Sequence, residues 1–365
     1  MTQPESRIRS VVPSSLKGKL IAITLAWLVI ISGLHSWLNV NWVFVLNDYL
    51  PVMKRRVVVG YIPVTCQLTC PVTDYISKYS ENGEMYIPRM FQGFPELKEA
   101  LIANKIQAAF IVAPMAIALA SQGVPIKVVY LGHRNGSAVV VRRNGPIRNF
   151  GELRGKTIAI PTRFSDERLL LLRAMRDYNM PAGSLRMVEM APPDVAGALQ
   201  AGAIDSFVMG EPFPSQAEMG KYGRILFYAD KYWPNYMSCI LVVREDLIQS
   251  RPEAVQVLVD GIARSGLWLD TSRPHRMDAA DFVGRYYYHQ KPELLRWALT
   301  KPMSRIRYNL LAPQKADFDQ VRDLMLEAGL IKKKISFSEY TDMQFADHAS
   351  TATAWKYEPG DASAK

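Results

Sequence analysis

One pattern occurs twice in the sequence, as ALIANKIQAAFIVAP at residues 100–114 and as ALQAGAIDSFVMGEP at residues 198–212. In each copy a helix is expected to end near Asn104 or Gly202, because both residue types tolerate the left-handed conformation that closes helices. The apolar run that follows predicts a buried parallel strand. Pro114 and Pro212 then stand where a new helix is expected to begin its first turn.

The junction between a strand end and a helix start is where α/β folds bind ligands, because free backbone N–H groups point into the crevice. Two copies of this junction predict two α/β lobes that face one cleft. The alternative is chance similarity between two helix–strand units, since Ala, Leu and Ile are common residues.

Composition is that of a globular protein. The chain has 365 residues, of which 49% are hydrophobic and 21% charged, enough for two domains with their own cores. The net charge of +10 is compatible with binding to nucleic acid or to an anionic membrane. However, the Lys and Arg residues are scattered and no nucleic-acid-binding signature is present. A solvated basic surface is therefore favoured, and no nucleic-acid partner is expected.

The N-terminal region predicts attachment to a membrane. A basic segment at residues 1–19 precedes an apolar run at residues 20–46, which is long enough to cross a bilayer. Because no good cleavage site is visible, an uncleaved signal anchor is preferred, with the globular part on the periplasmic or extracellular side of the cell membrane. The basic residues at 54–56 weaken the charge argument for this orientation, and a cleaved signal stays an alternative.

The rest of the chain alternates strands and helices, as a parallel sheet requires. Two similar runs, Ser137–Arg142 and Cys239–Arg244, are interpreted as the crossings between the lobes. Beyond Glu245 the pattern is mainly helical, and the small, polar segment 350–365 is expected to be disordered.

An ordered set of short motifs resembles a known family. The set contains the 60–63 GYIP motif, residues 96–114, residues 137–142, the 153–159 LRGKTIA motif, residues 198–212, the 242–246 VVRED motif and the 251–254 RPEA motif. It is similar to the substrate-binding proteins of ABC transporters for nitrate, sulfonate, taurine and thiamine-pyrimidine precursors. The resemblance covers roughly residues 57–349.

The resemblance implies a type II periplasmic-binding-protein fold, in which two α/β lobes are joined by two crossover strands. Lobe one would comprise residues 55–140 plus 244–345, and lobe two residues 145–238. A small molecule would bind between them and be delivered to an ABC permease and its ATPase. The implied ligand-binding residues are Pro63, Cys66, Cys70, Phe91, Phe94, Ala113, Pro114, Thr162, Ser165, Gly210, Glu211 and Cys239.

Several simpler interpretations stay open. Glu211 could receive a ligand amine or cap its helix, and Thr162 and Ser165 could hold an oxyanion or serve as caps. The five histidines lack metal-ligand spacing, so no metal, cofactor or catalytic residue is assigned. In the nitrate-binding branch a Lys occupies the place of Cys239, which argues against nitrate. A membrane-anchored ligand sensor and an enzyme resembling the pyrimidine-precursor synthases are the alternative functions.

The three cysteines, Cys66, Cys70 and Cys239, are all expected to border the cleft. Chance placement is one explanation, and a disulfide between Cys66 and Cys70 is another, since one helical turn gives a suitable separation. The third is that the thiols contact the ligand or a soft metal such as copper or zinc.

Overall fold

The computed structural model describes residues 14–51, 54–79, 83, 85–349 and 351–360. It divides into two compact units, residues 1–55 and residues 56–365. The predicted basic segment 1–19 lies mostly outside the described residues. Each unit is treated by itself below.

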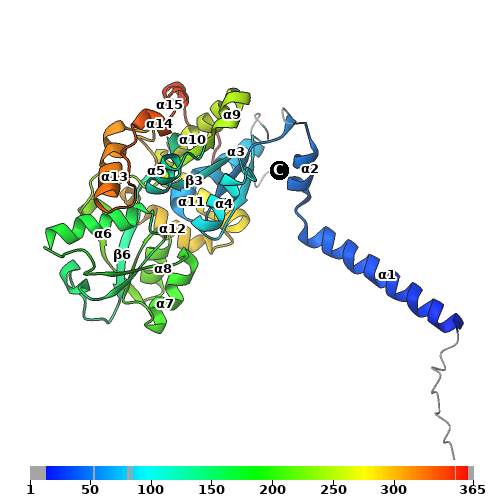
Figure 1. Ribbon diagram of the computed structural model, residues 1–365, viewed down its shortest axis with the longest axis horizontal. Helices are drawn as coiled ribbons and strands as arrows, with labels where there is room; N and C mark the ends of the chain where they lie inside the picture. Colours follow the sequence, from blue (N-terminus) through cyan, green and yellow to red (C-terminus); the bar gives the residue numbers. More distant parts are fainter. Residues whose placement is uncertain (1–13, 52–53, 80–82, 84, 350, 361–365) are drawn as a thin grey trace, which may run out of the picture. The chain divides into compact units, whose positions relative to one another are not determined.

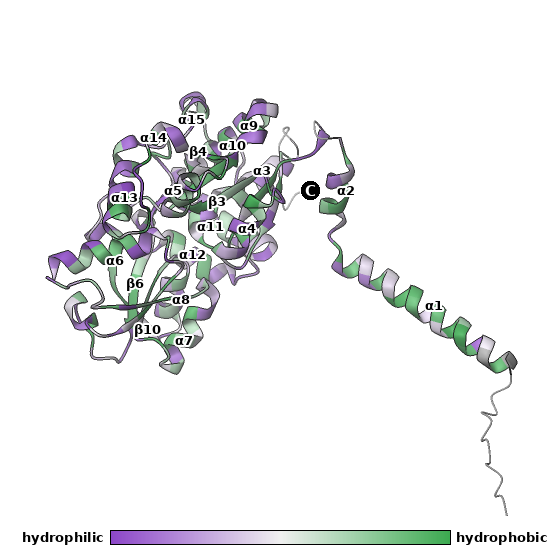
Figure 2. Cartoon of the chain, viewed as in Figure 1, coloured by the Kyte–Doolittle hydropathy of each residue, from purple (hydrophilic) through white to green (hydrophobic). Residues whose placement is uncertain are grey.

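The N-terminal unit contains two helices, α1 (Ser14–Asn39) and α2 (Trp42–Tyr49). The Asn41 side chain accepts a hydrogen bond from the Val43 N–H at 3.2 Å, which caps the start of α2. The expected continuous span at 20–46 is therefore divided. Residues Gly18–Asn39 of α1 form a helix long and apolar enough to cross a membrane, and Figure 2 shows how strongly hydrophobic it is.

The second unit is built on two five-stranded sheets (Figure 1). The first sheet has the order β2-β1-β3-β11-β4 and consists of β1 (Val58–Tyr61), β2 (Ile87–Met90), β3 (Ala108–Val112), β4 (Ile126–Leu131) and β11 (Cys239–Arg244). The second has the order β10-β6-β9-β7-β8 and consists of β6 (Ser137–Arg142), β7 (Thr157–Ile160), β8 (Arg186–Glu189), β9 (Ser206–Gly210) and β10 (Gly223–Tyr228). A short pair, β5 (Arg134–Asn135) and β12 (Ile306–Arg307), completes the strands.

Helices surround both sheets. Those that pack around the second sheet are α6 (Asp166–Asp177), α7 (Val195–Ala201) and α8 (Phe213–Met219). The other helices are α3 (Thr69–Tyr79), α4 (Phe94–Ile102), α5 (Ala113–Ser121), α9 (Glu245–Ser250), α10 (Pro252–Thr271), α11 (Arg273–Val283), α12 (Pro292–Thr300), α13 (Lys315–Glu327), α14 (Phe337–Tyr340) and α15 (Gln344–Ala349). This is a mixed α/β fold.

The doubled sequence pattern corresponds to α4-β3-α5 and α7-β9-α8. Both predicted helix stops adopt positive φ angles, 55° at Asn104 and 76° at Gly202, and β3 and β9 are buried along their whole length. Pro114 lies in the first turn of α5 as expected. Pro212 differs, because it is the N-cap of α8 and the helix begins one residue later.

The two runs expected to cross between the lobes form β6 and β11, but each lies wholly within one sheet, β6 in the second and β11 in the first. Each is an antiparallel strand inserted beside parallel neighbours: β6 pairs with β9 and β10, and β11 pairs with β3 and β4. The chain passes from the first sheet to the second at residues 132–136 and returns at residues 229–238. Residues 137–142 belong to the second sheet, because their backbone pairs with β9 and β10. The second sheet therefore begins at residue 137, whereas the boundary between the lobes was expected between residues 140 and 145.

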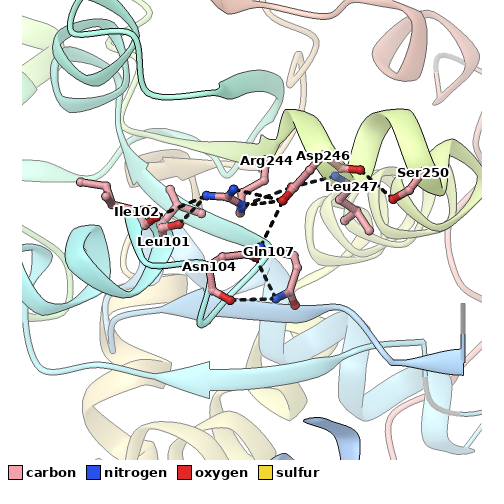
Figure 3. Close-up of polar contacts among 8 residues, drawn as sticks. All are labelled: Leu101, Ile102, Asn104, Gln107, Arg244, Asp246, Leu247 and Ser250. Atoms are coloured by element: carbon pink, nitrogen blue, oxygen red, sulfur yellow. Dashed lines mark hydrogen bonds and ion pairs between the residues drawn. The ribbon is translucent and has the colours of Figure 1, made fainter. Parts of the chain in front are cut away.

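Arg244 ties the end of β11 to the end of α4 (Figure 3). Its guanidinium donates to the carbonyl oxygens of Leu101 at 3.1 Å and Ile102 at 3.4 Å, and pairs with Asp246 at 3.0 Å. A cation is favourable beside the exposed carbonyl groups of a helix C-terminus. Asp246 also accepts from the Asn104 side chain at 3.1 Å, so this part of the family-like motif has a structural role.

The expectation of a disordered segment at 350–365 is wrong for residues 351–360. Trp355 and Tyr357 are buried, and the Trp355 indole N–H donates to Ser265 Oγ at 2.9 Å. The Tyr357 carbonyl accepts from the Trp268 indole at 2.8 Å. Two aromatic side chains in a polar segment bury enough apolar surface to hold it against α10.

Candidate functional site

The strand-end loops of the two sheets contact one another directly. Thr65, in the 3-10 turn Thr65–Gln67 after β1, donates to the Glu211 carbonyl through its N–H at 2.8 Å and its hydroxyl at 3.1 Å. The Ala113 N–H at the start of α5 donates to Asp166 Oδ2 at 3.3 Å. Loops that the sequence placed on opposite sides of a cleft are therefore in contact in this structure.

Two of the three cysteines meet at this junction. The sulfur atoms of Cys66 and Cys239 are 2.8 Å apart, and the Gln67 side-chain amide donates to the Cys239 sulfur at 3.4 Å. All three cysteines are free and buried. Burial raises the pKa of the Cys66 thiol, which favours the protonated form.

Cys70 has different surroundings. It lies in α3, and its carbonyl accepts from the Tyr86 hydroxyl at 2.5 Å. The disulfide considered between Cys66 and Cys70 is not formed in this structure, in which both cysteines are free and Cys66 contacts the sulfur of Cys239. Within the described residues no group of three or more His, Cys, Asp or Glu side chains has a metal-binding arrangement.

Gly132 permits the close approach of these segments. A Cβ atom at this position would lie 2.3 Å from the Cys66 carbonyl oxygen and 3.3 Å from that of Cys239. The Gly132 N–H donates to the Cys239 carbonyl at 2.8 Å. Any side chain here would have to displace backbone atoms, so the first link between the sheets requires glycine.

Two carboxylates at the same junction were not among the site residues expected from the sequence. Asp166 and Glu167 open α6 directly after its N-cap, Ser165, whose hydroxyl accepts from the Arg168 N–H at 3.2 Å. Ser137 Oγ donates to Glu167 Oε1 at 3.0 Å. From sequence, acidic residues in a first helical turn are expected to be solvated and to complement the helix dipole. Only the structure shows that these two are buried.

Burial also changes the acidity of these groups. Asp166 and Glu167 are 1% and 4% exposed. Removal from water raises the pKa of both carboxyl groups, and the nearby charge of Glu167 raises that of Asp166 further. Asp166 Oδ1 and Glu167 Oε2 have no hydrogen-bond partner among the described residues.

Glu211 is satisfied within the protein. Its carboxylate accepts from the Ser215 N–H at 3.0 Å, which supports the capping interpretation, and pairs with Arg305 at 3.0 Å. Burial raises the pKa of Glu211 to about 7, although Arg305 acts in the opposite direction. Arg305 lies 94 residues further along the chain, and no local pattern marked it as the partner.

The other expected site residues are spread around the junction. Thr162 is one wall of a cavity of about 410 Å³ that is also lined by Lys98, Met115 and Phe164. The remaining positions are Pro63, whose carbonyl accepts from Gln290; Phe91, beneath the Arg89 guanidinium; Phe94, at the start of α4; Pro114, in the first turn of α5; and Gly210, opposite Ser137 at the end of β9.

His133 lies in the first link between the sheets and is also buried. Neither of its ring nitrogens has a hydrogen-bond partner in the described part of the chain. Burial lowers its pKa to about 3, so the imidazole is neutral near neutral pH. Its ring contacts the Tyr308 ring edge-on at 5.7 Å.

This mixed α/β fold, with two sheets whose strand-end loops meet, matches solved periplasmic binding proteins. A family model described as "NMT1-like family" matches residues 51–284. The chain belongs to this family. The family resemblance inferred from the short motifs is thereby confirmed.

The chain is also similar to individual proteins, in sequence to the first one below and in fold to the second. The taurine-binding periplasmic protein of Escherichia coli is 29% identical over 202 residues, which are 52% of this chain and 61% of that protein. This chain thus matches about three fifths of the relative's length. The ligand-binding component of an ABC-type import system from Staphylococcus aureus, solved with zinc bound, superposes with a TM-score of 0.73 at 22% identity, covering 81% of this chain and 99% of that one.

An enzyme shares the fold as well. The desulfurization enzyme DSZB superposes with a TM-score of 0.59 at 13% identity and covers 80% of this chain and 98% of its own. At this identity the similarity concerns the fold alone. Fold by itself therefore does not separate binding from catalysis.

Proposed function

We propose that this protein is an extracytoplasmic solute-binding protein that captures a small molecule between its two sheets and delivers it to an ABC permease. The observation that carries the proposal is the junction of strand-end loops. There Asp166, Glu167 and Tyr236 keep buried polar atoms that have no hydrogen-bond partner among the described residues. Buried polar atoms are almost always paired in folded proteins. A position that leaves several of them unpaired is suited to a ligand that supplies the missing partners.

The proposed architecture is the type II binding-protein fold with a lobe on each sheet. The expected lobe bounds were 55–140 plus 244–345 for lobe one and 145–238 for lobe two. With β6 in the second sheet and β11 in the first, lobe one would comprise residues 55–131 plus 239–345, and lobe two residues 137–228. The hydrogen bonds from Thr65 to Glu211 and from Ala113 to Asp166 would then hold a closed form. Opening would bend the two links, in the manner of hinge motions around ligands.

Native mass spectrometry of the full chain, extracted in mild detergent from the membranes of its host, tests this function. A small molecule should remain bound to the protein. After the ligand has been removed, adding the released fraction back should compact the protein in X-ray scattering. A chain that carries no small molecule and keeps one radius of gyration in both states would contradict the proposal.

We further propose that α1 anchors the protein in the cell membrane. Its apolar side chains between Leu20 and Leu38 are largely exposed, as a lipid-facing helix requires. The expected result is that the mature protein stays in the membrane fraction after carbonate washing, with residues 20–39 still present at its N-terminal end. A soluble mature chain that starts after Asn39 would instead establish a cleaved signal.

Binding is favoured over catalysis because the taurine and ABC-import relatives are both named as binding components. The relationship to DSZB keeps an enzyme as the second candidate. Chemical conversion of the bound molecule during incubation with the purified chain would separate the two. Release of the molecule unchanged supports binding.

A further inference from the structure

The candidate site holds three buried oxygen atoms that the fold leaves unpaired. Asp166 Oδ1, Glu167 Oε2 and the Tyr236 hydroxyl have no hydrogen-bond partner among the described residues. Their side chains are 1%, 4% and 0% exposed. Water therefore does not reach these groups from the outside, and each one is unfavourable unless something binds it.

The three groups form one cluster with the two thiols. Ser137 Oγ, which donates to Glu167 at 3.0 Å, and Cys66 Sγ both lie beside Gly210, at 3.8 and 4.0 Å from where its Cβ atom would be. Burial raises the pKa of the Tyr236 phenol, and the nearby charges of Glu167 and Asp166 raise it further. The charge of Glu167 contributes to the raised pKa of the Cys66 thiol, and the charge of Cys239 contributes to the raised pKa of Asp166. We name these residues, Cys66, Asp166, Glu167, Tyr236 and Cys239, the acid–thiol cluster. They come from the 3-10 turn after β1, the start of α6, the returning link and the first residue of β11.

Among the described residues, the groups placed against the two carboxyl groups of this cluster are neutral donors and other acids. Neutral groups donate to the two carboxylates. Among them, the Ala113 N–H bonds one oxygen of Asp166, and the Ser137 hydroxyl bonds one oxygen of Glu167. The groups that act on Asp166 by charge are Glu167 and Cys239, which can only add negative charge. In the described part of the chain no Lys, Arg or His forms an ion pair with either carboxylate.

A structural role in the helix start explains only part of this arrangement. A solvated acidic side chain at a helix N-terminus stabilises the helix modestly. Here both are buried side by side, and like charges at close range oppose ionisation of both. A fold that needed only a helix cap already has one in Ser165.

We propose that the acid–thiol cluster binds the protonated nitrogen of a small cationic or zwitterionic ligand, with Asp166 and Glu167 as its counter-ions. An ammonium group has three N–H donors and no acceptor, which matches the three unpaired oxygen atoms of Asp166, Glu167 and Tyr236. Burial favours the protonated form of both carboxyl groups when the site is empty. A bound cation would favour their ionisation, whereas a bound oxyanion would oppose it. This inference rests on the proposed function and names the chemical class of its ligand.

The test uses two probes of similar size and opposite charge, n-propylammonium and propionate, with the full chain in detergent. The expected result is that n-propylammonium raises the unfolding temperature in a saturable way and propionate does not. Asp166→Asn and Glu167→Gln should each weaken n-propylammonium binding by at least about 30-fold, because a desolvated charge pair is lost. The matched control, Asp177→Asn, changes an exposed acid in the same helix and should leave binding unchanged.

Stability separates a binding role from a structural one. Without probe, the Asp166→Asn and Glu167→Gln proteins should unfold at the same temperature or higher, since each removes a buried acid from beside another. Lower unfolding temperatures with unchanged n-propylammonium affinity would overturn the proposal, as would equal binding of both probes or binding of neither. A co-purified ligand without a cationic nitrogen would refute this inference and leave the proposed function intact, whereas a chain without any ligand would refute both.

Discussion

Arg305→Met is expected to lower the free energy of unfolding by about 3–5 kcal/mol near pH 8, because it leaves a buried carboxylate without its counter-ion. Glu211 is 0% exposed and Arg305 is its cation at 3.0 Å. Arg305 also donates to Ser215 Oγ at 2.7 Å and lies over the Tyr228 ring at 4.9 Å. Chemical denaturation of the variant and the wild type measures the loss.

The loss should shrink as the pH falls toward about 5. The folded-state pKa of Glu211, about 7, lies above its ordinary value of 4.5. Its contribution to stability is therefore full below pH 4.5 and is lost as the pH rises through about 7. Without Arg305 that pKa rises further, so at low pH the carboxyl group is protonated and its burial costs less.

Two controls identify the cause. Glu211→Gln should restore much of the stability when it is combined with Arg305→Met, since no buried charge then remains. Arg176→Met removes the exposed pair between Arg176 and Glu327 and should cost less than about 1 kcal/mol. Equal losses for Arg305→Met and Arg176→Met would show that burial of the Glu211 pair is energetically unimportant.

Trp268→Ala should lower the free energy of unfolding by about 3–5 kcal/mol, as truncation of a large buried aromatic side chain does. Trp268 lies in α10, is 0% exposed and stacks on the His275 ring with a centroid distance of 4.5 Å. Its indole also holds the Tyr357 carbonyl. The variant should therefore lose protection of residues 351–360 in hydrogen exchange at the same time as it loses stability.

Val257→Ala is the matched control, because Val257 lies in the same helix and is 44% exposed. Its effect should stay within about 0.5 kcal/mol. If Trp268→Ala changed hydrogen exchange no more than Val257→Ala, residues 351–360 would be held by other contacts. Trp355, through its bond to Ser265, would then be the anchor.

Local patterns were sufficient for most of the fold. The doubled pattern, the αL residues Asn104 and Gly202 and the N-cap Ser165 act through their immediate neighbours, and all three are confirmed. The runs that became β6 and β11 also match their strands residue for residue. The sheet order of these two strands could not be read locally, because their pairing partners lie far away in the chain.

The candidate site depends on long-range contacts and was anticipated only in part. Cys66 and Cys239 were both placed at the cleft, yet their direct contact across 173 residues had no sequence signal. Asp166 and Glu167 look like ordinary first-turn acids until their burial is known. Whether the twelve expected residues bind a ligand stays a prediction.

The position of β11 in the first sheet affects the order in which the chain can fold during synthesis. β11 is the strand neighbour of both β3 and β4, so β4 has no partner strand in its sheet until Cys239–Arg244 has been made. By that point every strand of the second sheet is already available. We therefore expect the second sheet, formed by residues between 137 and 228, to fold first. β11 would then complete the first sheet late, in a slow, long-range pairing step. Until that step, β4 is an unprotected edge strand that can pair with another chain.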